Sequence, residues 1–253
     1  MKNLSAIIFL LSSVIVAFGQ SREATRINPQ TKPGILTEAE EAFKTFDFGK
    51  LVINPNNLTR KNIEDLRNNF YEEVKPHLLD EGESVNRLAR IAQPILLFHQ
   101  AGKSRTIVFN HQRPTVFTWK ETFITFSTGA MDILTDDEVA ALIAHEIGHL
   151  YFAEILAKAR EEKNEREARI IELKCDLVAL VTLSKLNIKP SNLISAVKKL
   201  VQRRSELGIG SFEKGSPSLK NREEILELFI SLEKTMIEKA SQHFRCNQSI
   251  NHT

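Results

Sequence analysis

The sequence of 253 residues predicts a mainly helical α+β domain with a small β-sheet. Apolar residues recur at helical spacing over most of the chain, whereas β-branched and aromatic residues gather between residues 105 and 128. Apolar residues make up 42% of the chain and charged residues 26%, as in an ordinary globular protein. The net charge of only +2 indicates no basic face for nucleic acid, so we expect no nucleic-acid partner.

Residues 1–19 predict a secretory signal peptide. Lys2 precedes an uncharged apolar run of about 15 residues, which ends in the small-x-small sequence Ala17-Phe18-Gly19. An uncleaved membrane anchor is the alternative, but the run is shorter than the ~20 residues that a spanning helix needs. We therefore expect an exported protein, periplasmic or secreted, whose mature chain contains no membrane span.

The N-terminal third follows as a leader and a set of helices. Residues 20–35 are polar and predict a disordered leader. Residues 36–82 predict the N-terminal helices. The first begins at Thr37, where Thr-Glu-Ala-Glu resembles a capping box, and a second covers 56–76.

Residues 83–240 predict the main domain, which opens with a helix and a small sheet. Apolar residues at helical spacing predict a helix over 84–100, which Pro94 interrupts. The periodicity then changes, and three short segments bounded by turn residues predict strands at 105–111, 114–119 and 122–128.

The second half of this domain is helical again. Thr135 and Glu138 form a capping box that fixes the start of a long helical stretch. Further helices are predicted at 191–207 and 219–240, and residues 241–253 form a polar tail.

Two imidazoles interrupt the apolar run ALIAHEIGHLYFAE of residues 141–154. His145 and His149 are four residues apart, so they project from one helical face about 6 Å apart and can share one ion. Glu146 lies beside His145 but at an angle, where it can act on a water molecule without binding the ion. This arrangement is typical of zinc metallopeptidases, and a coincidence on a buried helix is the alternative.

A catalytic zinc ion requires a third protein ligand and an open fourth position. Glu172 and Asp176 are again four residues apart on one helical face. In a straight helix Glu172 would lie about 35 Å from His149, so the chain must reverse between them if both bind one ion. We place the turn in the charged stretch around Asn164. An exposed helical carboxylate is the alternative reading of Glu172.

Together, ILTDDEVAALIAHEIGH and the later ELKCD resemble the gluzincins of peptidase family M48, which includes HtpX proteases, CAAX prenyl endopeptidases and BepA-like periplasmic proteins. The resemblance spans about residues 83–232. It implies a zincin-like fold with the sheet next to the helix of the two histidines, one Zn²⁺ per chain, Glu172 as third ligand and Asp176 as the partner of a ligand histidine. It also implies an extended or unfolded polypeptide substrate that pairs with an edge strand.

The chain departs from the family pattern at two positions. Cys175 stands where alanine is usual and could bind the metal or oxidise. Ser216 replaces the histidine of a C-terminal segment that aligns Arg222 with the family arginine. By this resemblance Arg222 is a candidate transition-state stabiliser, and a structural ion pair is its favoured alternative reading.

The sequence thus predicts an exported zinc endopeptidase in which Glu146 serves as general base, and the resemblance implies a role in quality control of envelope proteins. The alternative from another class is a binding or chaperone-like module that retains zinc but cleaves little. A helical scaffold without metal is a third reading.

Overall fold

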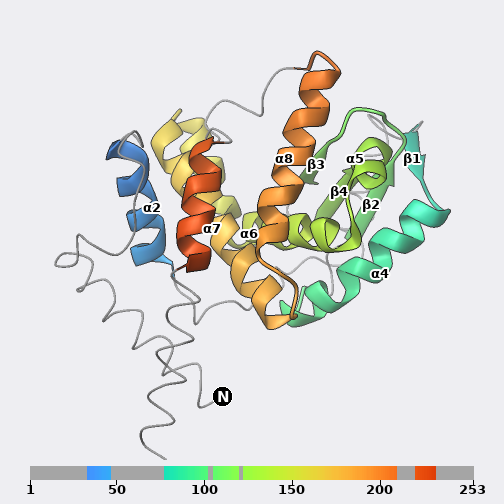
Figure 1. The fold of residues 1–253 in the computed structure, drawn as a ribbon, viewed down its shortest axis with the longest axis horizontal. Coiled ribbons are helices and arrows are strands. Elements are labelled where there is room, and N and C mark those ends of the chain that lie inside the picture. Colours follow the sequence, from blue (N-terminus) through green and yellow to red (C-terminus); the bar gives the residue numbers. More distant parts are fainter. Residues whose placement is uncertain (1–32, 47–76, 102–104, 120–121, 210–219, 232–253) are drawn as a thin grey trace, which may run out of the picture.

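A computed structural model describes residues 33–46, 77–101, 105–119, 122–209 and 220–231 of the chain. Over these ranges the protein is mainly helical with one four-stranded sheet, which confirms the predicted fold class. Figure 1 shows the sheet on one side of the molecule, the long helices α6 and α7 in the middle, and α2 at the opposite side.

The sheet has the strand order β1-β2-β4-β3. Its strands are β1 (Leu78–Leu79), β2 (Arg105–Phe109), β3 (Val116–Trp119) and β4 (Phe123–Ser127). β2 and β4 are parallel, and β1 and β3 pair antiparallel to them as the two edges. The three predicted strands are present with shorter bounds. β1 was not predicted, because two residues are too few to show a period.

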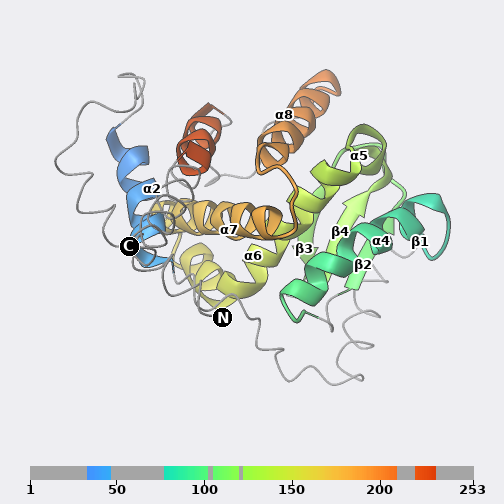
Figure 2. The same ribbon diagram turned by 60° about the horizontal axis from the view of Figure 1, so that its bottom comes forward.

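Helix α4 (Glu83–Phe98) packs against the sheet and α6, as Figure 2 shows. Its buried residues Leu88, Ile91 and Ile95 share one face. The helix continues through Pro94 and extends to Phe98, so Pro94 does not end it.

A short helix, α5 (Thr128–Ile133), fixes the loop of residues 110–115 that joins β2 to β3. The backbone N–H of Gly129 donates to the carbonyl oxygen of His111 at 2.9 Å. A Cβ atom at Gly129 would lie 2.0 Å from the carbonyl oxygen of Gln112, so only glycine allows this approach. The loop is therefore held firmly beside the sheet.

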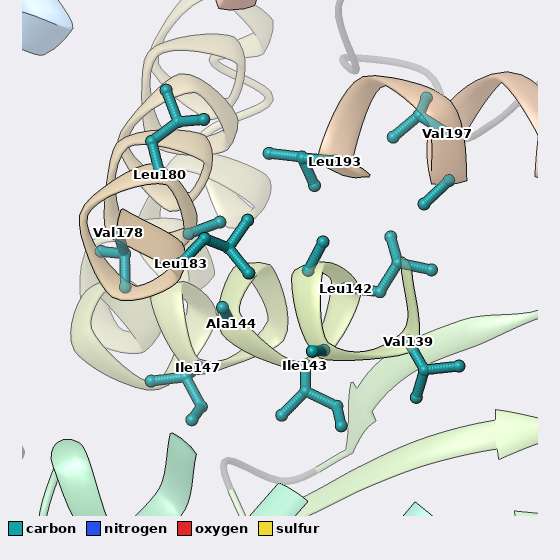
Figure 3. Packing of buried hydrophobic residues seen from close by; sticks show 14 of the residues in the cluster. Val139, Leu142, Ile143, Ala144, Ile147, Val178, Leu180, Leu183, Leu193 and Val197 are labelled. Carbon is teal, nitrogen blue, oxygen red and sulfur yellow. The ribbon is translucent and has the colours of Figure 1, made fainter. Parts of the chain in front are cut away.

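Helix α6 (Asp136–Glu161) is the central element of the core. Its predicted capping box is present: the Thr135 hydroxyl accepts from the Glu138 N–H, and the Glu138 carboxylate accepts from the Thr135 N–H. In Figure 3, Val139, Ile143 and Ile147 point to one side of the helix, whereas Leu142 faces Val197 of α8. By length and hydropathy α6 could cross a membrane, but 61% of its apolar window is buried inside the fold, as in a core helix.

The chain reverses directly after α6, as the sequence predicts. Lys163 adopts a left-handed conformation with φ of 54°, and Asn164 caps helix α7 (Glu165–Lys185) by accepting from the Glu167 N–H at 3.1 Å. The two helices pack closely as a hairpin. This hairpin brings Glu172 of α7 beside His145 and His149 of α6.

Three more helices surround the hairpin. They are α2 (Pro33–Thr45), α8 (Ser191–Glu206) and the helix formed by residues 220–231. α2 contacts α7 through the ion pair of Glu38 with Arg169, at 2.8 Å, and contacts the last helix through stacked rings of Phe43 and Phe229.

The structure differs from the predicted N-terminal boundaries. α2 begins at Pro33, four residues before the predicted start at Thr37, so the helix includes the end of the predicted leader 20–35. Proline suits a first helical turn, where its missing N–H has no partner to lose. The predicted signal peptide, the helix at 56–76, the end of the helix at 219–240 and the polar tail lie outside the described residues.

Candidate metal centre

His145 and His149 lie one helical turn apart on the same face of α6. Their ring centroids are 5.0 Å apart and the ring planes are nearly perpendicular, at 84°. His145 is only 5% exposed, whereas His149 is half-buried. Two imidazoles in such a poorly hydrated place need partners, because burial of an unsatisfied polar group costs about 1–3 kcal/mol.

Glu172 of α7 supplies a carboxylate to both imidazoles. Its Oε2 atom lies 3.5 Å from His145 Nε2, and its Oε1 atom lies 3.7 Å from His149 Nε2. In a tetrahedral zinc site with bonds of about 2.0–2.2 Å, neighbouring donor atoms lie roughly 3.4 Å apart. The three side chains therefore fit one zinc ion, with two nitrogen donors and one oxygen donor.

Gly148 allows α6 and α7 to approach closely enough for this arrangement. A Cβ atom at Gly148 would lie 2.6 Å from the Cα atom of Cys175 and 2.7 Å from its Cβ atom. The Cys175 Sγ atom lies 3.5 Å from His149 Nδ1, the ring nitrogen that does not face Glu172. Cys175 is a free, buried thiol that contacts His149 at the ring nitrogen away from Glu172.

Replacing Gly148 by alanine should push the hairpin apart. The added methyl meets the Cα and Cβ atoms of Cys175, which cannot move aside as the end of a flexible side chain can. Overpacking of this kind typically costs about 1–3 kcal/mol. We expect Gly148→Ala to lower the midpoint of urea denaturation and to weaken zinc binding, whereas Ala153→Gly, one turn beyond His149 on the same helix, should leave the zinc affinity close to wild type. Unchanged zinc affinity in Gly148→Ala would contradict the role of the close contact.

Asp176 and Arg222 both contact the Nδ1 atom of His145. The Oδ1 atom of Asp176 lies 2.8 Å from His145 Nδ1, so a neutral His145 donates its Nδ1 proton to Asp176 and keeps Nε2 free for a metal. Arg222 donates through Nε to Asp176 Oδ2 at 2.8 Å and contacts Oδ1 through Nη2. Asp176 is fully buried and Arg222 is 9% exposed. Arg222 thus forms the structural ion pair, although it also lines the cleft described below.

The pKa values of this cluster favour bound positive charge. Burial and the charge of Arg222 lower the pKa of His145, but hydrogen bonds to Asp176 and Glu172 outweigh them and raise it to about 9. Burial raises the pKa of Glu172, but its hydrogen bond to His145 and the charges of both histidines hold it well below the usual value. The carboxylates are therefore ionised, and a cation that binds here takes the place of a proton on His145.

Glu146 is held by the edge strand of the sheet. The Thr118 hydroxyl lies 2.9 Å from the Glu146 Oε2 atom and 3.0 Å from the Glu146 carbonyl oxygen, so its one proton can be donated to either acceptor. Donor atoms of Glu146, His145 and His149 lie within 4.8 Å of one another, but Glu146 is tied to β3 and Glu172 is the carboxylate that bridges the two Nε2 atoms. Thr118 was not singled out in the sequence, because only the strand pairing shows that it faces α6.

A cleft of about 730 Å³ opens over these residues. It is lined by β3, by α6 and α8, and by the side chains of Glu172 and Arg222; the lining includes Val116, Phe117, Thr118, Leu142, Ala153, Leu156, Val197 and Leu200. This volume lies within the usual range for ligand pockets, and the walls combine apolar side chains with polar and charged ones. The donor set is thus accessible from one side, where a substrate can approach.

A second buried polar cluster lies nearby and belongs to the scaffold. His99 is fully buried, with Nε2 at 2.7 Å from Thr182 Oγ1 and Nδ1 at 2.8 Å from the Tyr151 hydroxyl. Because the Thr182 hydroxyl donates to Val178 at 2.7 Å, it accepts from His99 Nε2, and Tyr151 donates to Nδ1. This chain of hydrogen bonds joins α4, α6 and α7 and uses the Tyr151 hydroxyl for structure.

Comparison with known families agrees with this geometry. The model of peptidase family M48 matches residues 83–206, which run from the first residue of α4 to the last residue of α8. The matched range contains the three larger strands, both histidines, Glu146 and Glu172, whereas Arg222 lies beyond it. No curated protein sequence matches the chain. Residues 83–206 therefore form a domain of peptidase family M48, a family of metallopeptidases.

Proposed function

We propose that this protein is an exported zinc-dependent endopeptidase that hydrolyses peptide bonds in extended or unfolded polypeptides. The observation that carries the proposal is the Glu172 carboxylate, whose two oxygens lie 3.5 and 3.7 Å from the Nε2 atoms of His145 and His149. A site of two imidazoles and one carboxylate that opens into a cleft matches the donor set of catalytic zinc sites.

Zinc at this site supplies Lewis acidity, which polarises a carbonyl group and acidifies water. Glu146 takes the proton of the attacking water as general base and then delivers it to the leaving amine. The Thr118 hydroxyl, 2.9 Å from Glu146 Oε2, keeps that carboxylate oriented toward the cleft. Proton transfer of this kind depends on distance, so the hydrogen bond to β3 contributes through geometry.

Asp176 and Arg222 orient His145 within the ligand set. Asp176 accepts the Nδ1 proton of His145 and thereby fixes the tautomer that presents Nε2. The guanidinium of Arg222 keeps Asp176 ionised in a fully buried position. Removal of either partner should therefore act mainly by weakening metal binding, and less through contacts with the substrate.

The nature of the substrate follows from the edge strand and the cleft. Among the described residues β3 is paired on one side only, with β4, and Val116, Phe117 and Thr118 line the cleft beside Glu146. An extended peptide can add to such an edge by main-chain hydrogen bonds, which selects unfolded segments over folded ones. The signal-like segment 1–19 supports action outside the cytoplasm, and the family resemblance supports a role in quality control of envelope proteins.

The proposal is tested with purified protein and an unfolded substrate such as casein. We expect one zinc ion per chain by metal analysis, casein cleavage that a zinc chelator abolishes, and recovery of cleavage when zinc is added back. Stoichiometric zinc without cleavage of casein or unfolded peptides would favour a zinc-retaining binding module. A protein without zinc affinity would overturn the metallopeptidase proposal.

A further inference from the structure

Helix α2 precedes the M48 domain in the sequence but packs against the hairpin that carries the metal centre. Figure 2 shows α2 across the end of the α6–α7 hairpin that is far from the sheet. The buried face of α2 consists of Glu38, Ala39, Ala42 and Phe46, all at most 7% exposed. A helix of 13 residues is marginal on its own, so tertiary contacts hold α2 in place.

The first of these contacts lies one turn before Glu172. Arg169 of α7 donates through Nε to Glu38 Oε2 at 3.0 Å and through Nη2 to Glu38 Oε1 at 2.8 Å. Glu38 is buried, and a buried carboxylate needs such a partner. Two parallel hydrogen bonds fix the orientation of the pair as well as its distance. Because Arg169 and Glu172 are three residues apart, α2 restrains the turn of α7 that presents the proposed third ligand.

The second contact lies one turn after His149. The ring of Phe46 packs against the ring of Phe152 on α6, with centroids 6.3 Å apart. The Nζ atom of Lys174 on α7 lies 5.8 Å from the centroid of the same Phe152 ring. Phe152 therefore interacts with α2 and with α7, three residues after a candidate ligand.

The third contact reaches the helix that carries Arg222. The rings of Phe43 and Phe229 are stacked, with centroids 6.1 Å apart. Arg222 lies two turns earlier in the same helix and pairs with Asp176, the residue that orients His145. Helix α2 thus contacts all three segments that supply the ligands and their ion pair: α6, α7 and residues 220–231.

We propose that α2 acts as a clamp that retains zinc in the metal centre, with Glu38 and Phe46 as positioning residues. This inference rests on the proposed zinc peptidase function and adds that a segment outside the M48 domain controls the same site. The donors come from both hairpin helices, so a shift of one helix against the other changes the distances between them. A metal site tolerates only small changes of this kind. The described residues of α2 do not line the cleft, so the clamp acts through the hairpin and not on the substrate.

The test measures how fast zinc leaves the zinc-loaded full chain when a chromogenic chelator is present in excess. In Glu38→Arg the new guanidinium group faces Arg169, and the two like charges repel. In Phe46→Ala the packing against Phe152 is lost. Each variant should release zinc about five- to tenfold faster than wild type, a size typical of substitutions in a packed network that couples two sites. Glu38→Gln keeps the shape of the side chain and loses only its charge, so it should accelerate release by about two- to threefold.

Two controls separate the clamp from the added charge and from overall stability. Glu41→Arg makes the same charge reversal on the same helix, but Glu41 pairs with Arg166 in an exposed ion pair, and exposed pairs contribute little. Arg87→Met removes a part-buried ion pair with Asp136, at 2.7 Å, between α4 and α6. It should lower the urea midpoint by an amount similar to Glu38→Arg. Both controls should nevertheless release zinc within about twofold of the wild-type rate.

Amide hydrogen exchange gives a second readout, which needs neither a substrate nor a chelator. Residues 165–172 of α7 should exchange faster in Glu38→Arg and Phe46→Ala than in wild type, and at the wild-type rate in Arg87→Met. Unchanged zinc release in the α2 variants, or an equal increase in Arg87→Met, would overturn the clamp, and casein cleavage by wild type would leave the peptidase function intact. Faster release in the α2 variants without any cleavage by wild type would support the clamp and overturn the peptidase function. A wild-type chain that binds no zinc would overturn both.

Discussion

Replacing Glu146 by glutamine is expected to lower kcat for peptide hydrolysis by about 10³-fold. The glutamine side chain has almost the same shape and can still accept a hydrogen bond from Thr118, which lies 2.9 Å from the carboxylate in the wild-type protein. It cannot take up a proton, however, so the step that depends on a general base is lost. Zinc content and the circular dichroism spectrum should remain unchanged, since the ion is assigned to His145, His149 and Glu172.

The matched control is Glu154→Gln, because Glu154 is an exposed glutamate on the same helix. Its kcat should stay within about twofold of wild type, as expected for a surface substitution. If Glu146→Gln retains a tenth or more of the wild-type kcat, Glu146 is not the base. If the variant loses zinc as well, Glu146 serves as a ligand, and the assignment of Glu172 must be revised.

Replacing Arg222 by methionine should cost about 3–5 kcal/mol of unfolding free energy. The reason is the partner that remains: Asp176 is fully buried, and its carboxylate would keep only the hydrogen bond from His145. Zinc affinity should also fall by about 10–100-fold, because Asp176 would no longer be held in the position that orients His145. Urea denaturation of the metal-free protein and competition with a chelator measure the two effects separately.

Two further variants show whether the charge is the cause. Arg203→Met removes an exposed ion pair with Glu206 and should cost at most about 1 kcal/mol. Adding Asp176→Asn to Arg222→Met removes the unpaired charge, so the double variant should be more stable than Arg222→Met alone. Wild-type stability of Arg222→Met would show that the buried carboxylate does not need its partner.

The parts of this site that lie within one helix, or across one sharp turn, follow directly from the sequence. His145 and His149 are placed by helical periodicity alone. Glu172 required one more inference, that the chain reverses near Asn164, and the polar composition of that stretch identifies the turn. Gly148 is also a local signal in the sequence, because a residue without a side chain in an apolar helix indicates a close contact, which the structure places at Cys175.

The contacts between distant segments could not be predicted in the same way. Thr118 reaches Glu146 only because β3 pairs with β4 and packs against α6, and strand pairing has no local signal in the sequence. The parallel pairing of β2 with β4 likewise depends on the whole sheet. For Arg222 the sequence favoured an ion pair without naming the partner, because 46 residues separate it from Asp176. α2 starts at Pro33, because proline is favoured in the first turn of a helix. The capping-box pattern at Thr37 led to a later predicted start.

Because α6 and α7 pack closely at Cys175, the reactivity of its thiol measures how often the two helices separate. Its thiol is fully buried against the Gly148 backbone, and burial raises its pKa, so a thiol reagent in solution reacts with it only after the helices separate. In a chain with Cys246 replaced by serine, the labelling rate would therefore record how often α6 and α7 part. An ion that binds residues of both helices should slow that rate. The labelling rate therefore measures the fraction of protein that holds the ion, and no substrate is needed.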